Sequence, residues 1–199
     1  MNINVTVEEL QAAGFPMGGE PLVALDLADT VMTVKDPPVD LIGDPAAGAV
    51  WWNIQARRLP PGPAPAAAAV RRLRTAIRDV LDAHVEGREA NPASVEDINA
   101  TASSVPRSPR LVATGQGMRQ ETRWHIEHGG NAALAAIAGE VIGLLAGPER
   151  LALLRRCESP DCSMLFLAEN KRRKWCVGNI CGNRARVARH YGRTHPRDT

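Results

Sequence analysis

Residues 157–181, CESPDCSMLFLAENKRRKWCVGNIC, contain all four cysteines of the 199-residue chain. The cysteines form two close pairs, Cys157 with Cys162 and Cys176 with Cys181, separated by a short loop. This spacing favours a tetrahedral Zn²⁺ site, because each pair can form a tight turn around the ion while the loop closes the tetrahedron. Four thiolates complete the coordination and leave no position for a catalytic water. The spacing therefore predicts one structural zinc ion.

An iron–sulfur cluster and paired disulfides are the alternatives to zinc. The first 156 residues contain no cysteine, and the N-terminal stretch MNINVTVEELQAAG has neither the basic region nor the long apolar region of a secretory signal. We therefore expect a cytoplasmic location. In that reducing compartment, clustered cysteines bind metal more often than they form disulfides.

Basic residues lie between and after the cysteine pairs. An apolar stretch at 164–168 precedes the run KRRK, which predicts a two-stranded hairpin with a basic tip. Gly182 and Asn183 can start a final helix whose Arg side chains recur on one face. The residues expected to contact phosphates are Lys171, Arg172, Arg173, Lys174, Arg186, Arg189 and Arg193.

The charge of the chain is unevenly distributed. Residues 149–199 carry 12 Lys/Arg and 5 Asp/Glu, whereas residues 1–148 carry 12 Lys/Arg and 17 Asp/Glu. A basic end on an acidic body indicates an anionic partner, and release of counterions from phosphates would drive binding to DNA. A merely solvated charged face is the alternative. Trp175 either stacks on a base or shields the metal site, and the second role is the more common one.

Residues 157–193 resemble the CGNR zinc finger, which is named for the Cys-Gly-Asn-Arg sequence that stands here at 181–184. The match includes both cysteine pairs, Phe166, the basic run and the Trp-Cys pair at 175–176. The resemblance implies a small β-hairpin followed by a helix, and DNA binding in transcription control. It adds Arg184 as a candidate DNA contact, with a hydrogen bond to a carbonyl of a cysteine turn as its alternative role.

The upstream region is similar to the ABATE domain, which precedes this finger in bacterial proteins described as stress-induced transcription regulators. The similarity rests on LVALDLADT at 22–30, LRTAIRDVL at 73–81 and Asn99. It implies an ABATE-like regulatory or sensing domain at 1–147 and a finger with a lead-in helix at 148–199.

The chain departs from both family patterns at a few positions. Asp29 stands where Asn is expected, and Ala168 and Glu169 stand where the finger commonly has Asp and Ser or Thr. These departures leave the four cysteines intact. They affect the expected contacts of residue 29 and the turn chemistry at 168–169.

The N-terminal region is expected to be predominantly α-helical with one small antiparallel β-hairpin, so that the whole chain belongs to the α+β class. Residues 22–34 predict a strand running into a helical turn, and alternation on either side of a GQG turn predicts a hairpin over 110–128. Helices are expected over residues 44–59, 66–86, 94–102 and 129–147, and from 148 up to Cys157.

Two sets of side chains in the N-terminal region are candidates for binding. The candidate pocket for a small-molecule effector comprises Asp26, Asp29, Trp51, Trp52 and Arg123, with core packing and helix capping as their alternative roles. The sequence HIEH also contains two histidines, His125 and His128. On a strand these two side chains point to opposite faces, so we expect surface residues rather than a shared metal site.

Several classes of protein are disfavoured by the sequence. It contains no Walker A, G-x-S-x-G or H-E-x-x-H motif, so an enzyme is not expected. The apolar stretch 129–147 includes Asn131, Glu140 and several glycines, which favours a buried helix over a membrane span. We therefore predict a DNA-binding regulator with an N-terminal sensing domain. A second copy of the chain, in a homodimer, is a candidate partner. A zinc-stabilised protein-interaction module without DNA binding is the alternative.

Overall fold

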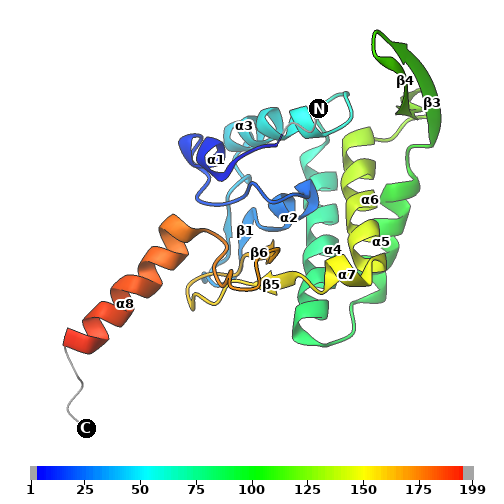
Figure 1. Cartoon of the computed structure of the whole chain (residues 1–199). Coiled ribbons are helices and arrows are strands. Elements are labelled where there is room, and N and C mark those ends of the chain that lie inside the picture. Colours follow the sequence, from blue (N-terminus) through cyan, green and yellow to red (C-terminus); the bar gives the residue numbers. More distant parts are fainter. Residues whose placement is uncertain (1–3, 195–199) are drawn as a thin grey trace. The chain divides into compact units, whose positions relative to one another are not determined.

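The computed structural model describes the backbone of residues 4–194 and the side chains of residues 4–191 (Figure 1). The chain divides into two compact units. The cysteine unit consists of residues 1–55 and 144–199, and the helical unit consists of residues 56–143. The cysteine-rich segment thus shares a unit with the start of the chain. The domain boundary expected between residues 147 and 148 stays a prediction.

The helical unit is built on a long amphipathic helix, α4 (Ala67–Glu86). Its apolar residues recur at helical spacing, and Leu73, Ile77 and Leu81 are fully or nearly fully buried. The helix ends at Gly87, which adopts the left-handed conformation with a φ of 66°. Helix α5 (Pro92–Ser103) packs beside α4, begins two residues before the predicted start and is capped by Asn91. Helix α6 (Ala132–Ala146) corresponds to the helix predicted over residues 129–147.

An antiparallel hairpin of β3 (Arg107–Thr114) and β4 (Gly117–Trp124) extends from the helical unit (Figure 1). Its register runs from the pair Arg107 with Trp124 to the pair Thr114 with Gly117. The predicted hairpin is confirmed, but β4 ends at Trp124 rather than continuing to His128. The preceding Pro106 has no backbone N–H, which prevents the partner strand from extending the ladder in the usual way. The chain turns instead into a 3-10 helix, η2 (Ile126–His128).

The cysteine unit combines short helices with two-stranded sheets. Its N-terminal elements are α1 (Val7–Ala12), α2 (Val23–Ala28), β1 (Val31–Met32), β2 (Val39–Asp40) and α3 (Pro45–Gln55), with the 3-10 turn η1 (Ala56–Arg58) following in sequence. Its C-terminal elements are α7 (Pro148–Leu151), β5 (Leu154–Arg156), β6 (Leu165–Leu167), the π-helical turn η3 (Gly178–Gly182) and α8 (Asn183–Thr194). The predicted α+β class, with a hairpin and a final helix in the cysteine-rich segment, is confirmed.

Three local predictions were wrong. In residues 22–34 the helix α2 comes first and the short strand β1 second. The helix that starts at Pro148 stops after one turn, and the chain continues as β5. The strand β6 pairs with β5, before the first cysteine, and not with a strand beyond the basic run, which was expected at the tip of the hairpin. The sequence LALLRR at residues 151–156 has a helical tendency, but its second half pairs with the fully buried β6 as a strand. This pairing supplies the backbone hydrogen bonds that a buried strand needs.

The outer edge of β6 is closed by carboxylates and not by a third strand. Both carboxylate oxygens of Asp29 accept hydrogen bonds from the Leu165 amide, at 3.0 and 3.1 Å. Glu20 Oε2 accepts a hydrogen bond from the Leu167 amide at 3.1 Å. These contacts satisfy buried backbone N–H groups that β5 does not reach, and they attach the N-terminal segment to the cysteine-rich segment.

A second buried carboxylate organises the loop that supplies Glu20. Asp26 accepts hydrogen bonds from the Glu20 amide at 2.9 Å and from Gln55 Nε2 at 3.1 Å. Trp51, on the same helix as Gln55, is 2% exposed and belongs to the core.

Among the described residues, no helix is both long and apolar enough to span a membrane.

We predict that Asp29→Ala lowers the free energy of unfolding by about 1–3 kcal/mol, because the buried Leu165 amide loses its acceptor. The measurement is urea unfolding of the zinc-loaded protein, followed by far-UV circular dichroism. Glu96→Ala, at an exposed position of α5, serves as the control and should change the value by less than about 0.5 kcal/mol. Equal effects of the two substitutions would contradict the role assigned to Asp29.

Candidate metal centre and nucleic-acid interface

The four cysteines converge in the core of the cysteine unit. All four are buried, and their Sγ atoms lie within 4.8 Å of one another. Cys176 Sγ lies 3.6 Å from Cys162 Sγ and 3.7 Å from Cys181 Sγ. A tetrahedron with Zn–S bonds of about 2.3 Å places its sulfur atoms about 3.8 Å apart. The cluster therefore has the size and the ligand set of a ZnS₄ centre, and its sulfur atoms are too far apart for disulfides.

The electrostatics of the four thiols favours a bound cation. Hydrogen bonds from Cys162 and Cys176 lower the pKa of Cys157, whereas the hydrogen bond to Cys157 raises the pKa of Cys162 to about 12. Burial raises the pKa of Cys181, and the charge on Cys157 raises it further. Four thiolates would repel one another in this buried space. A divalent ion provides the compensating charge, so that the residues present fit a single structural zinc.

Two backbone turns present the cysteines to the metal. In the first, the Cys162 amide donates to the Ser159 carbonyl at 3.0 Å, and the Cys157 amide donates to the Met164 carbonyl at 2.9 Å. In the second, Cys181 lies within the turn η3, immediately before α8. Buried apolar side chains surround the sulfur atoms and exclude water; they include Met17, Met164, Phe166 and Val177.

Arg173 is a structural element of the metal centre. Its guanidinium group donates to the carbonyls of Leu167 at 3.2 Å, Trp175 at 3.2 Å and Cys176 at 2.6 Å. It also pairs with Glu20 Oε1 at 2.5 Å and lies 4.4 Å from the centre of the Phe166 ring. One residue of the predicted phosphate-binding run is thus engaged inside the protein.

The partner of Arg173, Glu20, is itself buried. Burial raises its pKa above the ordinary value, and the Arg173 charge and the Leu167 amide counteract this effect. Glu20 therefore connects two parts of the centre, because one oxygen binds the β6 backbone and the other binds the arginine that holds the second cysteine pair. No sequence motif indicates a role for this residue, which is a lone acid in a glycine-rich segment.

The other basic residues differ in their surroundings. Lys174 pairs with Glu158 at 3.2 Å. The structure places the following predicted contacts on the surface of the cysteine unit, without an ion pair among the described residues: Lys171, Arg172, Arg184, Arg186 and Arg189. We call these five the unpaired cations. Arg193 lies on α8, but its side chain is outside the described residues.

Helix α8 carries three of the unpaired cations and extends away from β5 and β6 (Figure 1). Arg186 and Arg189 are three residues apart and therefore lie on one face of the helix. Val187 and Ala188 lie on the opposite side and line a cavity of about 380 Å³. The side of α8 that bears Arg186 and Arg189 therefore points away from the first cysteine turn.

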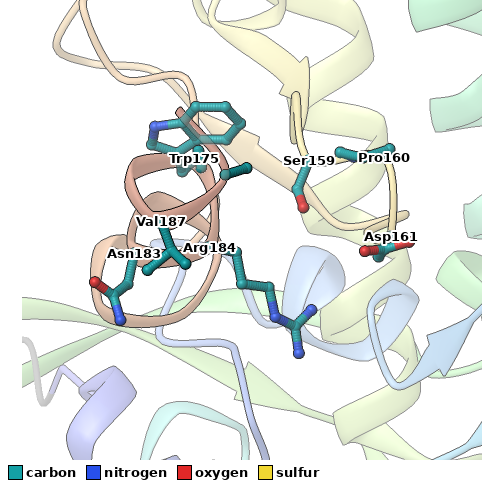
Figure 2. A pocket seen from close by; sticks show the side chains of 9 residues that line it. Ser159, Pro160, Asp161, Trp175, Asn183, Arg184 and Val187 are labelled. Carbon is teal, nitrogen blue, oxygen red and sulfur yellow. The ribbon is translucent and has the colours of Figure 1, made fainter. Parts of the chain in front are cut away.

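That cavity lies between the first cysteine turn and the first turns of α8. Figure 2 shows Ser159, Pro160 and Asp161 on one side and Asn183 with Arg184 on the other, with Trp175 at one end. Trp175 is half-buried and packs against the apolar shell of the cysteines. A Cβ atom on Gly182 would lie 3.2 Å from the indole, so glycine permits this packing.

Four of the predicted effector residues belong to the cysteine unit and the fifth to the helical unit. Asp26 and Asp29 bind backbone amides and Gln55, as described above. Trp51 is core, and Trp52 packs against it edge to face with ring centres 4.9 Å apart. Arg123 belongs to the helical unit, on β4, and lies 3.6 Å from Glu127.

The helical unit contains a cavity that the sequence did not indicate. Its volume is about 440 Å³, and residues of α4, α5 and the start of α6 line it. Leu73 and Leu134 provide apolar walls, and the ion pair between Arg72 and Asp97 lies at its side. Asn131 adds an amide group. Apolar walls with a few polar groups are typical of small-molecule sites.

We predict that the purified chain contains one zinc ion and that Cys176→Ser loses it, because three thiolates do not complete the tetrahedron in this dry site. Metal content measured by mass spectrometry, together with far-UV circular dichroism, tests this prediction. Asp161→Asn, an exposed change within the first cysteine turn, should retain one zinc ion. A zinc content unaffected by Cys176→Ser would contradict the assignment.

We further predict that Arg173→Ala lowers the free energy of unfolding by about 2–4 kcal/mol, because it leaves three carbonyls and a buried carboxylate without their donor. The adjacent exposed residue provides a matched control, and Arg172→Ala should change this quantity by less than about 0.5 kcal/mol. Urea unfolding at a fixed zinc concentration distinguishes the two variants. If both lose the same stability, Arg173 has no special structural role.

Comparisons with known families agree with this geometry. Residues 22–148 match the ABATE family, which is described as "Putative stress-induced transcription regulator". Residues 153–194 match the CGNR zinc finger. A search of curated proteins found no match. Both families are of regulator and zinc-finger types rather than enzyme types. Because the first match covers more than half of the chain, and the second contains the four convergent cysteines, the chain belongs to the ABATE family and carries a C-terminal CGNR zinc finger with a single structural zinc.

Proposed function

We propose that the chain is a DNA-binding transcription regulator that contacts phosphates with the unpaired cations of its zinc finger. The observation that carries this proposal is the accumulation of five exposed cations on α8 and on the turn after β6, without ion pairs among the described residues. Positive groups on a rigid scaffold neutralise phosphates at little cost in side-chain ordering compared with groups on a flexible tail.

The dimensions of α8 support contact with duplex DNA. The helix has 12 residues, which corresponds to about 18 Å, and the major groove of B-DNA is about 12 Å wide. Arg186 and Arg189 on one face would approach the phosphates, and Lys171 and Arg172 would extend the contact from the turn after β6. Zinc and Arg173 hold the second cysteine turn, from which α8 begins.

The regulatory input would come from the N-terminal part of the chain. We propose residues 1–147 as the sensing region and the cavity between α4, α5 and α6 as the place where a small effector binds. The support for this assignment is the mixture of Leu73 and Leu134 with the Arg72–Asp97 pair in one cavity. A reducing cytoplasm is the corresponding location, because the cysteines bind zinc as thiolates.

The competing function is a zinc-stabilised surface that binds another protein. The two functions differ in their response to salt, because release of condensed counterions is specific to the polyanion. Five phosphate contacts give a slope of about −4 to −5 for the logarithm of the association constant against the logarithm of salt concentration.

We predict this slope for the zinc-loaded chain and a mixed-sequence duplex, measured by fluorescence anisotropy across a salt series. Arg186→Ala combined with Arg189→Ala should make the slope less steep by about 2 and weaken binding at low salt, because two phosphate contacts are lost. The matched control is Arg71→Ala combined with Arg110→Ala, which removes the same charge from exposed positions of the helical unit. This control should leave the slope close to that of the unmodified chain.

Two outcomes would contradict the proposal. One is the absence of DNA binding at low salt by protein that contains one zinc ion, which would favour the protein-interaction function. The other is an equal loss of slope in the α8 variant and in the control, which would indicate a general charge effect without a defined interface.

A further inference from the structure

A second cluster of metal-ligating side chains lies in the helical unit, just after β4. His125, Glu127 and His128 each offer one ligand atom, and these atoms lie within 4.8 Å of one another. On a strand, the side chains of His125 and His128 would point to opposite faces. They lie instead at and within the 3-10 turn η2, in which residues three apart lie on the same side. The two histidine rings have their centres 6.3 Å apart.

The backbone on both sides of the cluster is fixed. The His125 amide donates to the Pro106 carbonyl at 2.9 Å, and the His128 amide donates to the His125 carbonyl at 3.3 Å. After the cluster, Gly130 has a φ of 81°, and a Cβ atom there would lie 2.6 Å from the Ser104 carbonyl oxygen. The turn is therefore held between the β-ladder and a close backbone contact, which limits the entropy lost when its side chains bind an ion.

The orientation of His125 is typical of a ligating histidine. Its Nε2 atom lies 2.9 Å from Ser108 Oγ, and its Nδ1 atom lies 3.0 Å from Glu127 Oε1. Histidine ligands usually bind the metal with one ring nitrogen while a hydrogen bond at the other fixes the ring. Ser108 can provide that hydrogen bond by accepting from Nε2–H, which leaves Nδ1 for the metal once its hydrogen bond to Glu127 is released.

We propose that His125, Glu127 and His128 bind a divalent first-row transition-metal ion such as Zn²⁺ or Co²⁺. Two imidazoles and one carboxylate suit such borderline ions, at bond lengths of about 2.0–2.2 Å. The ligand atoms must move closer than they are here, and Glu127 and His128 can do so by changing rotamer because both are exposed. Arg123, which lies 3.6 Å from Glu127, is also exposed and can turn towards solvent. Three protein ligands leave at least one position for water or for another ligand.

The experiment is a titration of Co²⁺ into tag-free protein whose cysteines already hold one zinc ion. Calorimetry measures the number of further ions bound, and absorption spectra show whether cobalt has reached sulfur. We expect one further equivalent, with weak d–d bands and no sulfur-to-cobalt charge transfer. His128→Ala should reduce this affinity more than tenfold, and Ser108→Ala should reduce it about tenfold by releasing the His125 ring.

His84→Ala is the matched control, because His84 is an exposed histidine of α4 in the same unit. It should leave the second equivalent unchanged, and retention of one zinc ion and of the circular dichroism spectrum would show that each variant is folded. The proposal is overturned if no second equivalent binds, or if His125→Ala and His128→Ala bind cobalt as tightly as the control. It is also overturned if cobalt enters only the cysteine centre, with the appearance of sulfur charge transfer.

Discussion

The place of the zinc centre in this fold depends on two carboxylates that act as the missing neighbour of a β-strand. Asp29 and Glu20 accept the hydrogen bonds of the Leu165 and Leu167 amides, on the edge of β6 that faces away from β5. All of β6 is buried, although a segment of about 40 residues has only a small core of its own. The first 55 residues therefore provide the core against which the cysteine-rich segment folds.

The same interaction continues towards the metal. Glu20 binds β6 with one oxygen and Arg173 with the other, and Arg173 donates to the carbonyl of Cys176. A chain of charged hydrogen bonds thus connects the N-terminal segment to a zinc ligand, and η3 and α8 follow that ligand directly. This arrangement explains why a basic run next to the second cysteine pair has two kinds of residue. Arg173 stabilises the centre, whereas Lys171 and Arg172 remain available at the surface.

Features that depend on local sequence were predictable. The cysteine spacing is sufficient to indicate a structural zinc. In each pair only four residues separate the cysteines, so a short turn brings both thiolates to the same ion. The long helix α4 followed from its apolar period and from Gly87 at its end. By contrast, LALLRR has no local signal that it pairs with β6 as a strand, and residues 164–168 have none that selects it as their partner. Glu20 was missed for the same reason, since its partners lie about 150 residues away.

The backbone expected for residues 125–128 was wrong, although the alternation that led to it is correct for β4. The alternation of apolar and polar residues along β4 is real, but it ends at Trp124, because Pro106 limits the ladder on the other strand. Extending that alternation by four residues put His125 and His128 on opposite faces, whereas a turn of 3-10 helix puts them on the same side. The sequence HIEH at residues 125–128 therefore separates the two histidine side chains on a strand, whereas in a 3-10 turn it brings them to the same side. The backbone conformation of residues 125–128 decides between them.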